Sequence, residues 1–146
     1  MQLRPKDENG HYQNSEAGTI ASLSDTLFNE YILSGYSLTP EDIEPALIAD
    51  FKLYAGWTST FTQDKGLVTT LDRTQIISIS EWAIIEPVIR AHCDLIQANR
   101  VEAMNSLGGE RFGLSVSEAT MGFTEAKREM ESKTFVEEPF FISFGG

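Results

Sequence analysis

Residues 79–109 decide the fold, and they read ISEWAIIEPVIRAHCDLIQANRVEAMNSLGG. Apolar side chains recur in this stretch at the spacing of one helical face, at Trp82, Ile85, Ile89, Leu95 or Ile96, Ala103 and Leu107. Ser80 is a suitable N-cap, and Glu81 favours the positive end of the helix dipole. We therefore expect the longest helix of the protein here, with a kink or break near Ile85 caused by Pro87. Gly108 and Gly109 should end it.

A further helix is expected after this glycine pair. Ser115-Val116-Ser117-Glu118 is a capping-box pattern, and it predicts a helix over roughly 116–132. The glycines between the two helices are interpreted as a turn, because no GK[ST] motif follows and Glu110 would repel a phosphate. The two predicted helices are therefore neighbours along the chain.

Residues 135–146, FVEEPFFISFGG, hold four of the nine phenylalanines. A strand would place Phe140, Ile142 and Phe144 on one face of the chain. Such side chains need burial, either on the core of their own subunit or on another molecule. We interpret the stretch as an extended arm that binds a partner through its apolar residues and its proline, namely Phe135, Pro139, Phe140, Phe141, Ile142 and Phe144.

Two more helices are expected before the long one. Thr39-Pro40-Glu41-Asp42 is a strong helix start, and Gly56 is a suitable stop, with Pro45 restricting or kinking the first turns. Ile20, Leu23, Leu27 and Tyr31 predict a shorter helix over 20–36, capped by Ser22 or Ser24 and stopped by Gly35. Residues 57–79 are interpreted as loops, with a hairpin of strands 66–71 and 74–79.

The fold class that follows is mainly α. We expect a small helical bundle with a short β-hairpin or extended loops, and an extended C-terminal arm. The expected organisation is a flexible N-terminal arm over 1–17, a helical domain over 18–134 and the extended arm over 135–146.

The composition excludes several classes of function. The 146 residues carry 22 acidic and 11 basic side chains, a net charge of −11. This balance argues against binding along a phosphate backbone or on an anionic membrane. No apolar stretch is long enough to span a membrane, and residues 1–17 lack the apolar core of a signal peptide. The single cysteine forms no intrachain disulfide, so we expect a protein made and used in the cytoplasm or in particles assembled there.

The search for chemistry gives no strong site. His92 lacks a second donor at metal-binding spacing, and a core or interface histidine is the better interpretation. Cys93 lies in mid-helix, where a cysteine usually acts as a small apolar residue. His92, Arg100 and Glu102 on one helix are the only material for an enzyme site built across subunits. We expect no enzymatic activity, no metal and no cofactor.

Three features together resemble the small helical neck proteins of tailed bacteriophages, the head-to-tail adaptor or head-completion proteins. They are the opening 79–83 with Pro87, the connection 107–118 with its glycines, and the ending Lys133-Thr134-Phe135 followed by Pro139 and apolar residues. The resemblance covers about half of the chain.

This resemblance implies a structural role in the virion neck, with assembly in the host cytoplasm. Such adaptors form a homo-oligomeric ring, a dodecamer, beneath the portal protein. The ring extends the DNA channel, lets DNA pass without specific binding, and docks the tail or stopper proteins. A terminal segment reaches the portal or a neighbouring subunit. Two alternatives stay open, another neck or tail-completion subunit (stopper or terminator) and a non-viral adaptor module that binds a peptide.

Overall fold

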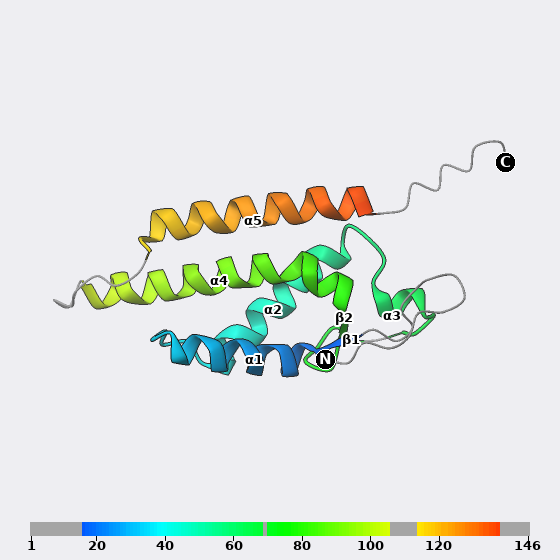
Figure 1. The fold of residues 1–146 in the computed structure, drawn as a ribbon, viewed down its shortest axis with the longest axis horizontal. Coiled ribbons are helices and arrows are strands. Elements are labelled where there is room, and N and C mark those ends of the chain that lie inside the picture. The colour runs from blue at the N-terminus through cyan, green and yellow to red at the C-terminus, as the bar shows by residue number, and fades with distance from the viewer. Residues whose placement is uncertain (1–15, 69, 106–113, 138–146) are drawn as a thin grey trace.

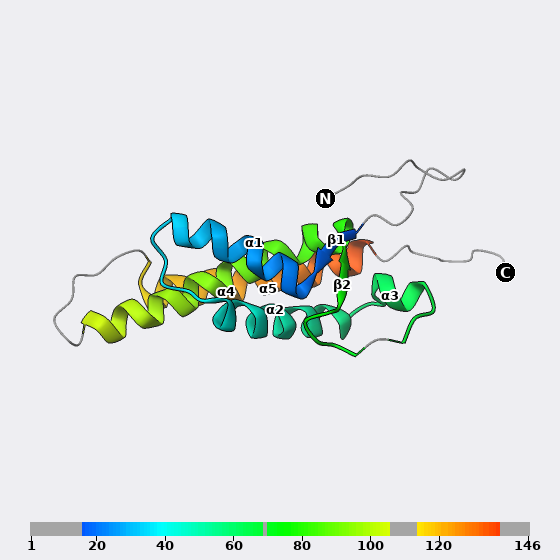
Figure 2. The ribbon, with the colours of Figure 1, turned by 90° about the horizontal axis from the view of Figure 1, so that it is seen from below.

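A computed structural model describes residues 16–68, 70–105 and 114–137 of the protein. In chain order its elements are β1 (Glu16–Thr19), α1 (Ile20–Leu33), α2 (Pro40–Ala55), α3 (Phe61–Asp64), β2 (Ile76–Ser78), α4 (Ile79–Asn105) and α5 (Val116–Glu137). This composition confirms the prediction of a mainly α bundle with a small β element. Helices α1, α2, α4 and α5 alternate in direction, and α4 lies between α5 and the α1–α2 pair (Figures 1 and 2).

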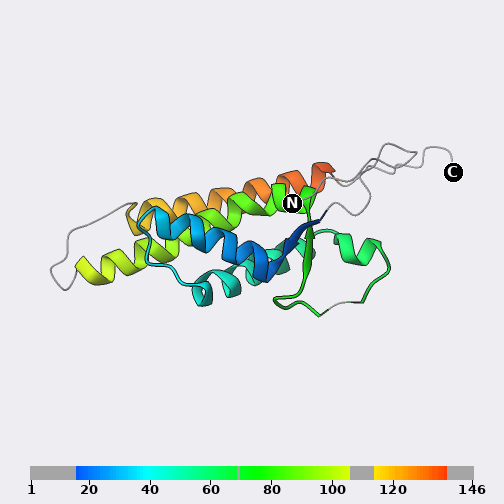
Figure 3. The ribbon, with the colours of Figure 1, turned by 60° about the horizontal axis from the view of Figure 1, so that its bottom comes forward.

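The bundle therefore has two unlike ends (Figure 3). We call one the sheet end, because β1, β2 and α3 lie there together with the last turn of α5. We call the other the hairpin end, because α1 and α4 finish there and α5 begins. This alternation places the two long helices α4 and α5 side by side in opposite directions.

Every helix start uses a serine or threonine paired with a polar residue three positions later. The predicted box at Ser115 is confirmed, because the Glu118 N–H donates to Ser115 Oγ at 3.1 Å. At Thr39, the Asp42 carboxylate accepts the Thr39 N–H at 2.8 Å. Each box supplies partners for backbone N–H groups that the first helical turn leaves unpaired.

Two predicted caps were wrong by two or more residues. The α1 cap is Thr19, whose Oγ1 accepts the N–H of Ser22 at 3.1 Å, so Ser22 is the third residue of the helix and not its cap. The α4 cap is Ser78, whose Oγ accepts the Glu81 N–H at 3.2 Å. Ser78 is favoured over Ser80 because the Glu81 carboxylate also accepts the Ser78 N–H at 3.0 Å, which closes the box.

The predicted strand pair was placed wrongly. Residues 66–68, 70 and 71 contain no strand, and β2 pairs instead with β1, antiparallel, with Thr19 opposite Ile76. Strand β1 also moves the end of the predicted N-terminal arm, because β1 begins at Glu16, which lies opposite Ser78. The pairing continues into α1, where the Ile20 N–H donates to the Gln75 carbonyl at 3.0 Å.

Helix α4 runs through Pro87 without interruption, so a break of the helix near Ile85, one of the two predicted effects of this proline, is wrong. Pro87 is exposed, so the carbonyl that lacks its N–H partner can be hydrated. The predicted apolar stripe holds at Ile85 and Ile89, both fully buried, but Ala103 is exposed. The buried face of α4 therefore extends to Val101, and the next residues, 102–104, are exposed.

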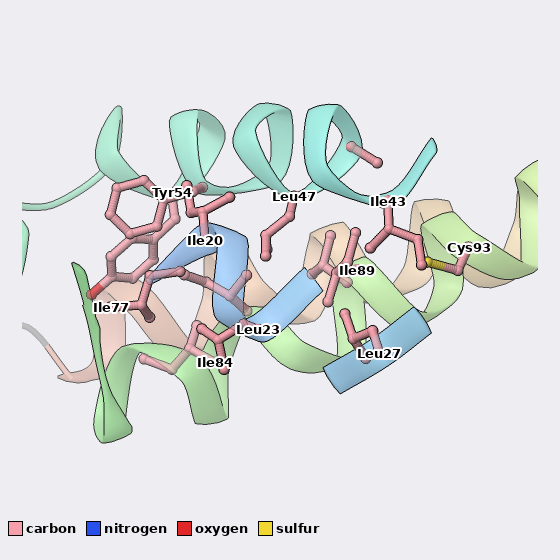
Figure 4. Packing of buried hydrophobic residues seen from close by; sticks show 14 of the residues in the cluster. Ile20, Leu23, Leu27, Ile43, Leu47, Tyr54, Ile77, Ile84, Ile89 and Cys93 are labelled. Carbon is pink, nitrogen blue, oxygen red and sulfur yellow. The ribbon is translucent and has the colours of Figure 1, made fainter. Parts of the chain in front are cut away.

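Side chains from all four long helices form one core (Figure 4). Its largest fully buried members come from α1, α2, β2, α4 and α5. They include Ile20, Leu27, Ile43, Leu47, Phe51, Ile77, Ile85, Ile89 and Met130. Burying a side chain of this size contributes about 1.5–3 kcal/mol to folding. The described helices therefore make a continuous core.

A polar seam fixes the α1–α2 connection against α4. Tyr36 donates its hydroxyl proton to Asp94 at 2.7 Å, and the Gln97 side-chain oxygen accepts the Ser37 N–H at 2.9 Å. One turn further, Arg100 donates to the Ser37 carbonyl at 2.8 Å and to Asp42 at 2.6 Å. These contacts explain why α1 and α2 meet α4 in one register.

Candidate functional site

The predicted partner-binding arm falls mostly outside the described residues. Pro139, Phe140, Phe141, Ile142 and Phe144 all lie beyond Glu137, the last of them. Phe135 is the exception, because α5 extends to Glu137. The predicted helix end at 132 and the arm boundary at 135 were therefore too early, and Phe135 continues the helix.

A half-buried polar contact joins three helices of the bundle. His92 on α4 lies 3.0 Å from Asp50 on α2, measured from Nδ1 to Oδ1, and its ring stacks on Phe123 of α5 at 4.4 Å. The Lys127 ammonium lies over the same Phe123 ring, with its Nζ 4.3 Å from the ring centre. Burial raises the pKa of Asp50, and the hydrogen bond with His92 opposes that shift. This arrangement matches the predicted core or interface histidine, since its partners fix packing between helices.

The three residues considered for a composite enzyme site have separate surroundings. Arg100 binds Asp42 and the Ser37 carbonyl, His92 contacts Asp50, and Glu102 is exposed. Cys93 is fully buried, and burial raises the pKa of its thiol to about 12. Among the residues that the structure describes, no three His, Cys, Asp or Glu side chains are placed to hold a metal ion.

The sheet end contains a half-open hollow of about 440 Å³, which we call the α3 hollow. This volume is within the range of about 300–1,000 Å³ typical of ligand sites. Helix α2, helix α3 and the chain between α3 and β2 supply its lining, which consists of Phe51, Ala55, Thr60, Gln63, Gly66, Leu67, Val68, Leu71 and Gln75.

Buried hydrogen bonds hold the walls of this hollow. Glu81 accepts the Phe61 N–H at 3.0 Å through Oε2, which ties α3 to the start of α4. Gln75 donates to Thr62 Oγ1 at 3.0 Å from the other side. Burial raises the pKa of Glu81, while its hydrogen bonds oppose the shift. The walls are therefore preformed.

The rim of the hollow is apolar and exposed because of a glycine turn. Gly66 has a φ of +76°, a conformation that side-chain-bearing residues rarely adopt, and its N–H donates to the Gln63 carbonyl at 2.9 Å. This turn ends α3 and leads into Leu67, half exposed, and Val68, fully exposed. Exposed apolar residues beside a hollow are typical of a docking surface.

The other exposed large apolar residues of the described chain lie away from the α3 hollow. Ile32 and Leu33 finish α1, whereas Met104 and Leu114 lie on α4 and just before α5, all toward the hairpin end. Met121 is on the second turn of α5. The α3 hollow thus combines exposed apolar residues with a concave surface.

Sequence reasoning missed this hollow. Residues 57–79 were interpreted as loops and strands, and the short α3 box Thr60-Phe61-Thr62-Gln63 was overlooked. Thr60 with Gln63 three positions later is a recognisable capping pattern, and Gly66 follows it as a stop. These two signals together could have located α3.

Comparison of the chain with protein-family models, curated proteins and solved structures finds no match. The described helices include none that is long and apolar enough to cross a membrane.

Proposed function

We propose that this protein is a structural subunit of the neck of a tailed bacteriophage, a head-to-tail adaptor. Copies of it assemble into a ring beneath the portal, extend the DNA channel and present a docking surface for the tail. The observation that carries the proposal is that the chain has a helical core and, separately, an apolar stretch after its last described helix. Described residues between Ile20 and Met130 supply one continuous core, and the apolar stretch of Phe140, Phe141, Ile142 and Phe144 follows the last described helix in the sequence.

The charge distribution supports this role. The net charge is −11, and the four arginines of the described residues all pair with carboxylates. Arg90, for example, contacts Glu30 at 2.9 Å and Glu86 at 3.2 Å. A channel wall of this composition repels phosphates, which favours passage of DNA over adhesion.

The test is assembly with the portal protein of the same virus. We expect light scattering and negative-stain images of the full chain with portal to show a ring on the portal. A complex of one copy with one partner peptide would favour the peptide-binding module instead. Binding to an existing adaptor ring, and not to the portal, would assign the chain to the stopper layer. Assembly at a tail end would assign it to the terminator layer.

A control variant guards against non-specific adhesion. Thr124→Lys changes an exposed position of α5 and adds one positive charge. It should leave assembly intact if the ring depends on specific contacts.

A further inference from the structure

We propose that the α3 hollow receives residues 139–144 of a neighbouring copy. This inference rests on the proposed ring function and names the contact that closes the ring. Each copy then offers two different surfaces, a hollow and an apolar segment. Such a heterologous contact generates a ring when its rotation closes.

Shape and polarity favour this occupant. The hollow has an apolar wall of Phe51, Ala55 and Leu71 and an exposed apolar rim of Leu67 and Val68. The segment Pro139-Phe140-Phe141-Ile142-Ser143-Phe144 is one of the most apolar stretches of the chain. An extended peptide gains affinity when alternate apolar side chains enter pockets of this kind.

Charge favours the same occupant. Residues 51–75 carry Lys52, Lys65 and Arg73 against Asp64 and Asp72, a balance of +1 in a chain of −11. Glu137 and Glu138 come directly before the apolar segment. Arg73 pairs with Glu44, so the stretch that lines most of the hollow still presents no net negative charge to repel this acidic segment.

The position of the α5 end along the bundle favours the hollow of a copy that lies beside the copy supplying the segment. Helix α5 ends at the sheet end, the same end as the hollow (Figures 1 and 3). Phe144 lies seven residues beyond Glu137 and so reaches at most about 24 Å from it. Copies placed side by side around an axis would keep the hollow of one and the segment of the next at the same height along that axis.

The experiment uses pairs of introduced cysteines in the full chain. Cys93 is buried, so it should not compete. Val68→Cys and Ile142→Cys are made as separate variants and mixed under mild oxidation, so that a 68–142 disulfide can form only between copies. We expect mass spectrometry to find that linked peptide. The matched control replaces Val68→Cys by Leu33→Cys at the hairpin end, and it should give at least about tenfold less product.

The variant with both Val68→Cys and Ile142→Cys tests the direction of exchange. We expect a ladder of linked copies on a non-reducing gel. A disulfide confined to the monomer would overturn the inference, because the segment would then occupy its own hollow. A 68–142 link that is absent while rings still form on the portal would overturn it and leave the proposed function standing. Absence of both link and ring would contradict both.

Alanine substitution supplies a second readout. Phe140→Ala with Ile142→Ala should weaken self-association by about tenfold or more, as expected for anchors in a pocket. Val68→Ser should weaken it too, whereas Leu33→Ser should not. Equal effects of the two serine variants would contradict a contact specific to the hollow.

Discussion

Asp42 is the residue that most directly couples a helix start to the packing of the bundle. Its carboxylate accepts the Thr39 N–H at 2.8 Å and an Arg100 N–H at 2.6 Å. The hydrogen bond from Arg100, followed by those from Thr39, lowers the pKa of Asp42 below its ordinary 3.8. The stabilisation that the ionised Asp42 carboxylate contributes to the folded state is therefore present above pH 3.8. It is lost as the pH falls through the lower pKa that Asp42 has in the folded protein.

We predict that Asp42→Asn lowers the free energy of unfolding by about 1–2 kcal/mol at pH 7, because a charged acceptor becomes a neutral one. The gap between the two proteins should shrink as the pH drops below about 3.8. Urea unfolding at pH 7, 5, 3 and 2 measures this. Glu41→Gln is the control, since it removes an acid from the same turn without those hydrogen bonds. A gap that stays constant down to pH 2 would contradict the assignment.

Glu81 connects three segments through one carboxylate, and a second prediction follows from that. Its two oxygens accept the N–H groups of Ser78 and Phe61, each at 3.0 Å. Glu81→Gln leaves one acceptor oxygen, so one buried N–H loses its partner at a cost of about 1–3 kcal/mol. Thermal unfolding should show the loss, together with faster hydrogen exchange at Phe61. Glu86→Gln, which alters a surface ion pair on the same helix, should cost less than about 1 kcal/mol.

At the scale of elements, α5 is the one of the four long helices with the fewest buried side chains among the described residues. Of its described side chains only Ala119, Met130 and Thr134 are buried, with Phe123 and Ala126 partly covered. Local opening follows low burial, so α5 should exchange its amide protons sooner than α2 or α4.

Met130→Ala tests this weak attachment. Met130 is only 1 % exposed, and its truncation should cost about 2–5 kcal/mol, with exchange accelerated most in α5. Met121→Ala removes the same side chain at a position 70 % exposed and should change stability by less than about 0.5 kcal/mol. Uniform acceleration across all helices in the Met130 variant would show that α5 opens only with the whole bundle.

The sequence allowed the helices to be predicted because their signals are local. Thr39-Pro40 and Ser115 were identified as helix starts from four residues each, and Gly56 as a stop. The errors at Ser80 and Ser22 arose where another hydroxyl residue two or three positions earlier completes the box better. The pairing of β1 with β2 could not be predicted, because it joins short segments far apart in sequence whose register depends on the helices between them.

The candidate site was harder to predict for the same reason. The α3 hollow combines the end of α2, a four-residue helix and the chain before β2, and no single stretch shows its shape. Composition alone predicts Phe140, Ile142 and Phe144 as binding residues, and all three lie outside the described residues. What such residues bind depends on a surface formed elsewhere in the fold.

At the scale of the whole molecule, the charge predicts behaviour toward DNA. Arg73, Arg90, Arg100 and Arg128 each have a carboxylate partner within 3.2 Å, so these guanidinium groups face anions already. Binding along duplex DNA requires several cations free to replace counterions.

We predict that the protein does not shift the fluorescence anisotropy of a labelled duplex in about 150 mM salt. This holds at protein concentrations up to roughly 100 µM, the weak limit of non-specific binding. A variant with Glu125→Lys, Glu129→Lys and Glu131→Lys on the exposed side of α5 provides the comparison, because it reverses three charges on one helix. This variant should bind with an affinity that falls steeply as salt rises. Salt-dependent binding by the unchanged protein would mean that a cationic surface faces the DNA, and the account of a repelling channel would fail.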